Sequence, residues 1–244
     1  MLRQISQVPR RCWSVNSATG VWNPSLQKLE SVLPARMTSS ESGPKECKVI
    51  QEAELTRGKW LYLSNHHWTD HTGKKRIWEV VGRTTKGPQD QDCVAVVATV
   101  SRSGHPDAMV LIKQFRPPLK SYTIEMPAGL VDNGETIETA ALRELKEETG
   151  YSGSITGIGR NVSLDPGMSS ATMKIVTVKV NGDDAVNKDV SRVCGVQGEH
   201  IEVILVPLNS LQKSLMDFAA DGLIIDSRVE AFALGFALTS EKII

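Results

Sequence analysis

Five glutamates and one aspartate crowd the segment Gly129 to Tyr151, and three of the glutamates have the spacing of metal ligands. On a helix, Glu144 and Glu148 lie one turn apart on the same face, with Glu147 three residues after Glu144. Like charges at this spacing repel one another, so a positive charge is expected nearby. Mg²⁺ prefers oxygen ligands and commonly bridges carboxylates to substrate phosphates. The triplet therefore predicts a divalent-cation site or, as the plainer alternative, a solvated acidic helix face.

A helix is expected to position these carboxylates. Thr136 can cap its N-terminus and Gly150 can end it. The buried stripe is predicted to consist of Ile137, Ala141 and Leu145, at i, i+4 and i+8. The Glu148 carboxylate should then point away from this stripe, toward solvent and metal.

Strands and further helices are expected around this helix. A hairpin is predicted from "KWLYLSN" (59–65) and "KRIWEVVGRTT" (75–85), joined by the polar turn "HHWTDHTGK" (66–74). Other strand-like runs are "CVAVVATVS" (93–101), "AMVLIKQFR" (108–116), "MKIVTVKV" (173–180) and "HIEVILVP" (200–207). Helical patterns occupy 210–220 and 227–238. This order predicts an α/β layered domain behind a small β appendage.

The overall composition excludes several classes of protein. The 244 residues carry 28 basic and 28 acidic side chains, and this balance does not favour a nucleic-acid binder. The four cysteines are widely spaced, so they indicate neither a zinc site nor a disulfide framework. Membrane-spanning helices need about 20 apolar residues, and runs of that length do not occur, so we expect no membrane partner.

Residues 1–45 differ in composition from the rest. Acidic residues are missing before Glu30, whereas basic side chains occur at Arg3, Arg10, Arg11 and Lys28. This profile is typical of a mitochondrial transit peptide, although a disordered leader would look similar. We therefore expect a cytoplasmic or nuclear protein, or a mitochondrial one if residues 1–36 are a transit peptide.

The acidic segment resembles the signature of the Nudix hydrolases. Five residues separate Gly129 from Glu135, seven more precede Arg143, and "RELKEETG" (143–150) completes the pattern. Tyr151 departs from it, because that family usually has an aliphatic residue there. The resemblance implies a Nudix α/β/α sandwich with a mixed sheet over residues 89–244. It also implies an N-terminal antiparallel β region at 46–88 that takes part in dimerisation.

Other segments extend the resemblance to the ADP-sugar pyrophosphatase branch of that family, over roughly residues 55–235. They are "IKQFRPP", "EMPAGL", "DPG" and "NGDDA". Pro166 lies sixteen residues after Gly150, where enzymes that cleave ADP-ribose characteristically carry a proline.

The resemblance implies a role for each matching position. Metal ligands would be Glu144, Glu148 and the backbone carbonyl of Ala128, with Mg²⁺ or alternatively Mn²⁺ bound. Glu147 would be a further ligand or a catalytic group, and Glu199 the general base, with Glu202 as the alternative. Substrate would be bound by Trp60, Trp78, Glu79, Arg83, Arg116, Glu125, Leu130 and Asp165.

Two groups of residues have competing interpretations. Trp60 and Trp78 could be core aromatics of the hairpin, whereas the resemblance places them on both sides of an adenine, with the site shared across a homodimer. His66, His67, Asp70 and His71 could hold zinc, but polar residues are expected in the hairpin turn and no other ligand motif accompanies them.

The function implied is Mg²⁺-dependent hydrolysis of a nucleotide-sugar diphosphate, chiefly of ADP-ribose to AMP and ribose 5-phosphate. One alternative is a hydrolase of oxidised nucleoside diphosphates such as 8-oxo-dGDP. Another is a nucleotide-binding protein without turnover, against which the complete acidic set argues.

Overall fold

The computed structural model describes residues 46–85, 92–188, 190, 193–194 and 200–240. The predicted leader 1–45 and the predicted base Glu199 lie outside these residues. In the described part of the chain, no helix is long and apolar enough to cross a membrane.

The N-terminal region is an antiparallel sheet of three strands rather than the predicted hairpin. Its strands are β1 (Lys48–Arg57), β2 (Leu61–Thr69) and β3 (Lys75–Arg83), in that order. The hairpin prediction missed β1 because "KVIQEAELTR" mixes strand formers with helix formers and shows no clean alternation. The turn between β2 and β3 is also shorter than predicted. It spans 70–74, with Gly73 at φ 85°, so the segment "HHWT" belongs to β2.

The larger sheet combines nine described strands, parallel and antiparallel. Its main path runs β10 (Val193–Cys194), β11 (Ile201–Pro207), β5 (Ala108–Arg116), β4 (Cys93–Ser101), β9 (Thr172–Asn181) and β8 (Ser154–Ser163). Off this path, β6 (Ser121–Glu125) pairs with β5 and β12 (Ile224–Ile225), while β7 (Ala128–Leu130) pairs with β4. The β4–β9 and β12–β6 pairs are parallel.

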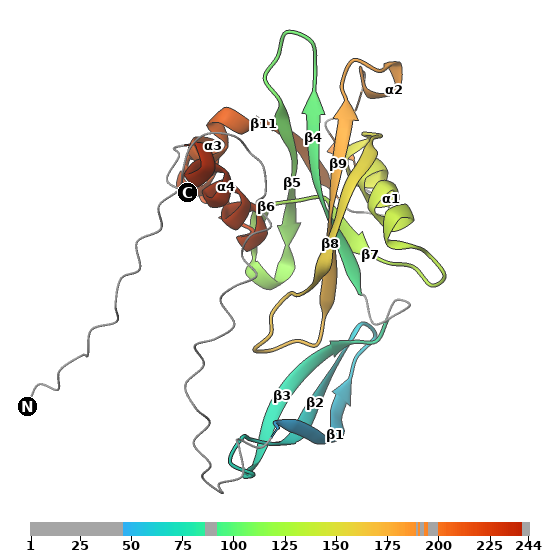
Figure 1. Cartoon of the computed structure of the whole chain (residues 1–244), viewed down its shortest axis with the longest axis vertical. Helices are drawn as coiled ribbons and strands as arrows, with labels where there is room; N and C mark the ends of the chain where they lie inside the picture. The colour runs from blue at the N-terminus through green and yellow to red at the C-terminus, as the bar shows by residue number, and fades with distance from the viewer. Residues whose placement is uncertain (1–45, 86–91, 189, 191–192, 195–199, 241–244) are drawn as a thin grey trace, which may run out of the picture. The chain divides into compact units, whose positions relative to one another are not determined.

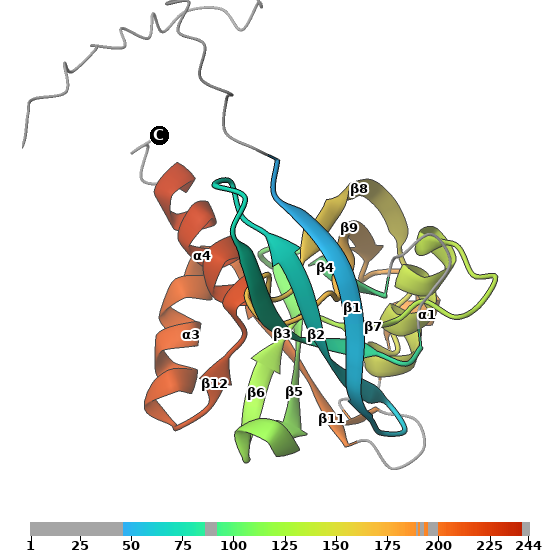
Figure 2. The same cartoon turned by 90° about the horizontal axis from the view of Figure 1, so that it is seen from below.

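Helices cover both faces of this sheet, as Figures 1 and 2 show. On one face lies α1 (Ile137–Thr149), and on the other lie α3 (Leu211–Ala220) and α4 (Ser227–Ser240). Successive side chains of β4 point to opposite faces of the sheet. Val96 packs in the hydrophobic cluster beneath α1, and Val97 packs in the hydrophobic cluster beneath α3 and α4. The predicted α/β/α sandwich with a mixed sheet is confirmed.

Short elements complete the described part of the chain. They are the 3₁₀ turns η2 (Pro117–Leu119) and η3 (Leu208–Ser210) and the helix α2 (Ala185–Lys188). Strand β3 contacts the loop between β8 and β9, where Val81 N–H donates to the Met168 carbonyl at 2.9 Å. Trp78 Nε1 donates to the Gly167 carbonyl of the same loop, also at 2.9 Å.

Candidate active site

A cavity of about 790 Å³ opens where the ends of β4, β5, β6 and β7 meet α1 and α4. This volume suits a nucleotide-sized ligand. Eight residues predicted from the sequence line it: Arg83, Arg116, Glu125, Ala128, Leu130, Glu144, Glu147 and Glu148. Segments far apart in the sequence thus converge on one site.

Local interactions fix α1 at the wall of this cavity. Thr136 is its N-cap, and the Thr136 hydroxyl accepts a hydrogen bond from Thr139 N–H at 3.2 Å. Gly150 ends the helix in the left-handed conformation, at φ 73°. Ala141 and Leu145 are buried against the sheet and Ile137 is partly buried against the same cluster, so the predicted cap, stripe and end are confirmed.

Gly129 leaves room for the Glu144 carboxylate. A Cβ atom at position 129 would lie 2.0 Å from Oε1 of Glu144. Any larger residue would therefore displace this carboxylate or move β7 away from α1. The glycine is required here by close approach rather than by backbone conformation.

Arg143 supplies the positive charge among the described acidic residues. Its guanidinium donates to Glu135 through two bonds of 2.9 Å, to Glu144 at 2.8 Å and to Glu147 at 3.2 Å. It also donates to the Leu130 carbonyl at 2.9 Å, which ties α1 to β7. The hydrogen bonds from Arg143 lower the pKa of Glu135. In turn, the carboxylates of Glu135 and Glu144 raise the pKa of Arg143.

The pKa of Glu144 is shifted in the opposite direction to that of Glu135. Burial raises the pKa of its carboxyl, and the hydrogen bond and charge of Arg143 oppose that shift without cancelling it. A carboxylate that is desolvated in this way favours any additional cation that reaches it.

Glu148 does not face solvent, so that prediction was wrong. The residue is only 7% exposed, and its carboxylate accepts a hydrogen bond from Ala128 N–H at 2.8 Å. The physical reason is that β7 folds over the end of α1, covering a side chain that helical periodicity alone leaves outside. Glu148 consequently supports the backbone of β7 as well as lining the cavity.

The donor set fits a hard divalent cation by its chemistry, since three carboxylates and the β7 backbone line one cavity. Its arrangement is not that of a completed metal centre. Among the described residues, no three acidic, histidine or cysteine side chains gather round one point. Arg143 holds Glu144 and Glu147, so binding a cation would require these carboxylates to exchange contacts with the guanidinium.

Arg116 and Glu125 form an ion pair with each other. Nε and Nη2 of Arg116 donate to the two carboxylate oxygens of Glu125, each at 2.7 Å. Glu125 is buried, whereas the Arg116 side chain is 42% exposed, so the guanidinium can still be reached from the cavity.

Several other predicted residues do not line this cavity. Trp60 and Trp78 are 58% and 50% exposed, and the Lys59 ammonium lies 4.7 Å from the centre of the Trp60 ring. Glu79 is exposed on β3, and Asp165 accepts a hydrogen bond from Gly167 N–H within the β8–β9 loop. A single chain therefore does not bring the tryptophans to the acidic site.

Glu202, the alternative base, is also outside the cavity. It lies on β11, where Nζ of Lys113 donates to its carboxylate at 3.1 Å.

The histidine cluster lies only partly in the predicted turn. His66 and His67 lie within β2, whereas Asp70 and His71 lie in the turn. The Asp70 carboxylate accepts hydrogen bonds from Thr72 N–H, Lys74 N–H and Arg76 Nε, and therefore organises the turn. These bonds give Asp70 a structural role and favour the polar-turn interpretation.

Six residues of the cavity were not predicted from the sequence: Cys93, Gln114, Asp132, Leu164, Met173 and Arg228. Each lies within two residues of an end of a strand or helix, and only the packing of those elements brings it to the site.

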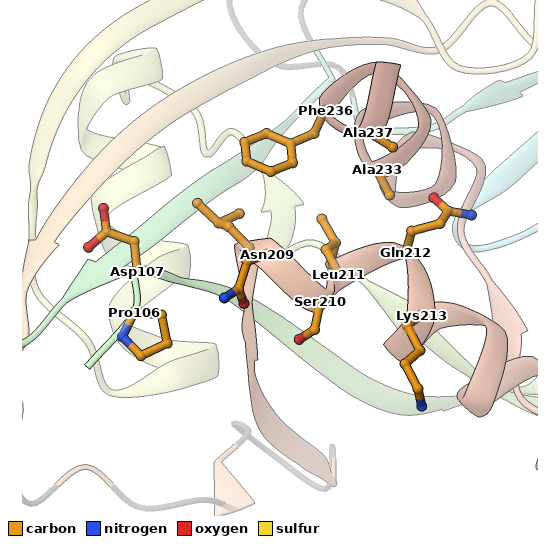
Figure 3. Close-up of a pocket in the computed structure, with 11 residues that line it drawn as sticks. Pro106, Asp107, Asn209, Ser210, Leu211, Gln212, Lys213, Ala233, Phe236 and Ala237 are labelled. Atoms are coloured by element: carbon orange, nitrogen blue, oxygen red, sulfur yellow. The ribbon is translucent and has the colours of Figure 1, made fainter. Parts of the chain in front are cut away.

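A second cavity, of about 680 Å³, lies between η3, α3, α4 and the β4–β5 turn (Figure 3). Phe236 and Ala233 of α4 face it from one side and Leu211 of α3 from another. Its lining includes two charged residues, Asp107 and Lys213, and none of the residues predicted for the site. The acidic cavity is the better candidate for diphosphate chemistry.

Comparisons with known proteins agree with this choice. A family model described as NUDIX domain matches residues 91–225. A Mus musculus protein named ADP-sugar pyrophosphatase is 41% identical over 205 residues, which cover 84% of this chain and 94% of the relative. A Saccharomyces cerevisiae protein named ADP-ribose pyrophosphatase is 36% identical over 210 residues, covering 84% of this chain and 90% of the relative.

A solved structure described as an ADP compounds hydrolase has a similar fold. The TM-score is 0.58, and the match covers 84% of this chain and 100% of the other. Sequence identity is 20%, so this likeness bears on the fold alone.

Proposed function

The chain belongs to the NUDIX domain family, and on that premise we propose that it hydrolyses the diphosphate of ADP-sugars, chiefly ADP-ribose, to AMP and ribose 5-phosphate. The observation that carries the proposal is the cavity itself. It combines the carboxylates of Glu144, Glu147 and Glu148 with the guanidinium groups of Arg83 and Arg116. The relatives named for ADP-sugars and ADP-ribose support the choice of substrate class.

Nudix hydrolases use a divalent metal, and we propose Mg²⁺ for this one, with Mn²⁺ as a substitute. Glu144, Glu148 and the Ala128 carbonyl would hold it, with Glu147 as a further ligand. Such a cation, when bound, neutralises diphosphate charge as a Lewis acid.

Protein groups perform the remaining tasks. Arg116, which is oriented by its ion pair with Glu125, binds the diphosphate through its guanidinium. A carboxylate must also accept a proton from the attacking water. The ion pair of Glu202 with Lys113 favours Glu199 or Glu147 for this step.

The small sheet supports a homodimer with shared sites. Seven large apolar side chains on it are exposed: Val49, Ile50, Leu55, Trp60, Leu61, Ile77 and Trp78. A three-stranded sheet with so much apolar surface is expected to be covered by another surface. We propose that a second copy covers it, so that the adenine is stacked by tryptophans beside the partner's carboxylates.

A substrate panel tests the proposed activity. Purified full-length protein with Mg²⁺ is incubated with ADP-ribose or with 8-oxo-dGDP, and the products are separated by chromatography. We expect AMP and ribose 5-phosphate from ADP-ribose. Turnover of 8-oxo-dGDP alone would indicate a hydrolase of oxidised nucleotides, and nucleotide binding without any turnover would indicate a binding protein.

Localisation depends on residues 1–45. If residues 1–36 form a transit peptide, a fluorescent protein fused after residue 45 enters mitochondria, and a chain that starts at Met37 retains its kinetics. Diffuse cytoplasmic and nuclear fluorescence would leave the leader without a targeting role.

A further inference from the structure

Arg228 reaches the acidic cavity from the first turn of α4. Its side chain lies at the wall formed by Cys93 and Met173 and is 22% exposed. A guanidinium in such a position is costly to desolvate unless its donors are used.

Asp226 holds this guanidinium in one orientation. Its carboxylate accepts hydrogen bonds from Nε of Arg228 at 2.7 Å and from Nη2 at 2.6 Å. Burial alone would raise the pKa of Asp226, but the hydrogen bond and charge of Arg228 outweigh burial and lower it. Asp226 N–H in turn donates to the Ile124 carbonyl at 3.0 Å, next to Glu125 in β6. The guanidinium of Arg228 is therefore fixed relative to β6, whose end forms part of the cavity wall.

The third nitrogen of Arg228 has a weak partner. Nη1 donates to the sulfur of Met173 at 3.2 Å, and a thioether is a poor acceptor for a charged donor. A guanidinium has five N–H groups. Within the described residues, three of them have hydrogen-bond partners, one of these being the sulfur. The other N–H groups of Arg228 can therefore still donate hydrogen bonds, and this side chain lines the cavity.

We propose that Arg228 is a substrate-binding residue, whose Nη1 exchanges the Met173 sulfur for a phosphate oxygen of the nucleotide. This inference rests on the proposed function. A phosphate oxygen is a far stronger acceptor for a guanidinium than a thioether is. Arg228 thus joins Arg83, Arg116 and Arg143 as a fourth guanidinium in the cavity for a substrate that carries two phosphates.

Binding of AMP and of adenosine separates this role from simple packing. The wild-type chain and Arg228→Met, which keeps the unbranched stem of the side chain but removes the guanidinium, are titrated calorimetrically with each ligand in the presence of Mg²⁺. We expect the Kd for AMP to rise about ten- to a hundredfold, as for loss of a hydrogen bond to a charged group. The Kd for adenosine should stay unchanged, because it carries no phosphate.

Two further variants control for damage to the fold. Asp226→Asn/Arg228→Met leaves no unpaired carboxylate, and its AMP affinity should equal that of Arg228→Met. Lys213→Met removes an exposed cation that pairs with Asp217 on α3, and it should bind AMP like the wild type. Thermal melts of all variants report whether they are folded.

Either of two results would overturn the inference. Unchanged AMP affinity in Arg228→Met would make Arg228 a structural residue, and equal losses for AMP and adenosine would place its effect on the nucleoside or the cavity shape. The proposed function is judged separately, by hydrolysis of ADP-ribose by the wild type. Phosphate binding through Arg228 without that hydrolysis would refute the function and retain the inference.

Discussion

Arg143 explains how so many carboxylates share one short helix. It bonds to Glu135, Glu144 and Glu147 at once and thereby offsets their mutual repulsion. Glu148, the fourth glutamate of the group, is held instead by the backbone of β7. Substitutions of the individual glutamates should therefore have distinct effects.

Substitution of Glu148 should separate catalysis from stability. Glu148→Gln keeps an acceptor for Ala128 N–H, whereas Glu148→Ala leaves that buried donor unpaired, at a cost of about 1 to 3 kcal/mol. Both variants should lose activity by at least about a hundredfold, because even residues that only support metal ligands often contribute ten- to a hundredfold. Calorimetric melts without metal and initial rates with Mg²⁺ check this. Equal stability of the two variants would show that the Ala128 bond contributes little.

Glu144→Gln should change stability in a pH-dependent way. The pKa of Glu144 is raised by burial, so the folded state binds its proton more tightly than the unfolded chain does. Native stability therefore falls as the pH rises from the ordinary value of 4.5 through the raised folded pKa. The variant lacks this titration, so its advantage in Tm over wild type, measured without metal, should be largest near pH 7 and vanish below pH 4.5. A Tm difference that does not vary with pH would contradict the expectation.

At the scale of elements, the site depends on the close approach of β7 to α1. The contact of Gly129 with the Glu144 carboxylate and the bond from Arg143 to the Leu130 carbonyl both lie at this junction. The helix and the strand must therefore keep a fixed separation for the acidic groups to share a cavity.

Gly129→Ala tests that separation. The added methyl would meet the Glu144 carboxylate, which is the far end of a flexible side chain and can turn aside, so we expect little change in the free energy of unfolding but weaker Mg²⁺ affinity. Gly235→Ala in α4 is the matched control, since no atom lies within 4 Å of its new Cβ. That control should gain up to about 1 kcal/mol from helix propensity. Denaturant titrations and Mg²⁺ binding measure both variants, and a Gly129→Ala protein that binds Mg²⁺ as tightly as the control would refute the close-contact argument.

At the scale of the whole molecule, one chain does not complete the proposed site. Trp60 and Trp78 are exposed on the small sheet, while the carboxylates line a cavity at the large one. Sharing of the site between two chains would resolve this separation.

Mixing two impaired variants tests the shared site. Trp60→Ala should weaken binding by about 1 to 3 kcal/mol through lost base stacking, and Glu148→Gln should abolish the metal site. In a mixed dimer, one site would receive Trp60 from one chain and Glu148 from the other, both intact. Random exchange should restore about a quarter of wild-type activity, because half of the dimers are mixed and each has one intact site of two. If a size-tagged subunit proves exchange and activity stays at the average of the two variants, Trp60 does not act across the interface.

The sequence by itself determined the loop and helix that carry the acidic groups. The Thr136 cap, the buried stripe and the left-handed Gly150 are local features, each set by interactions within a few residues. Continuous apolar runs likewise predicted β4 and β5 with the bounds that the structure shows. The layer architecture followed from the order of these elements and from the family pattern.

The tertiary structure determined those features of the site that depend on contacts between residues far apart in the sequence. Burial of Glu148 depends on β7, and the pairing of Arg116 with Glu125 depends on the register of β5 with β6. Strand β12, only two residues long, exists because it pairs with β6, and it leads Arg228 into the cavity. Such contacts join residues far apart in the sequence, so neither periodicity nor composition encodes them, and only the folded chain shows which side chains meet.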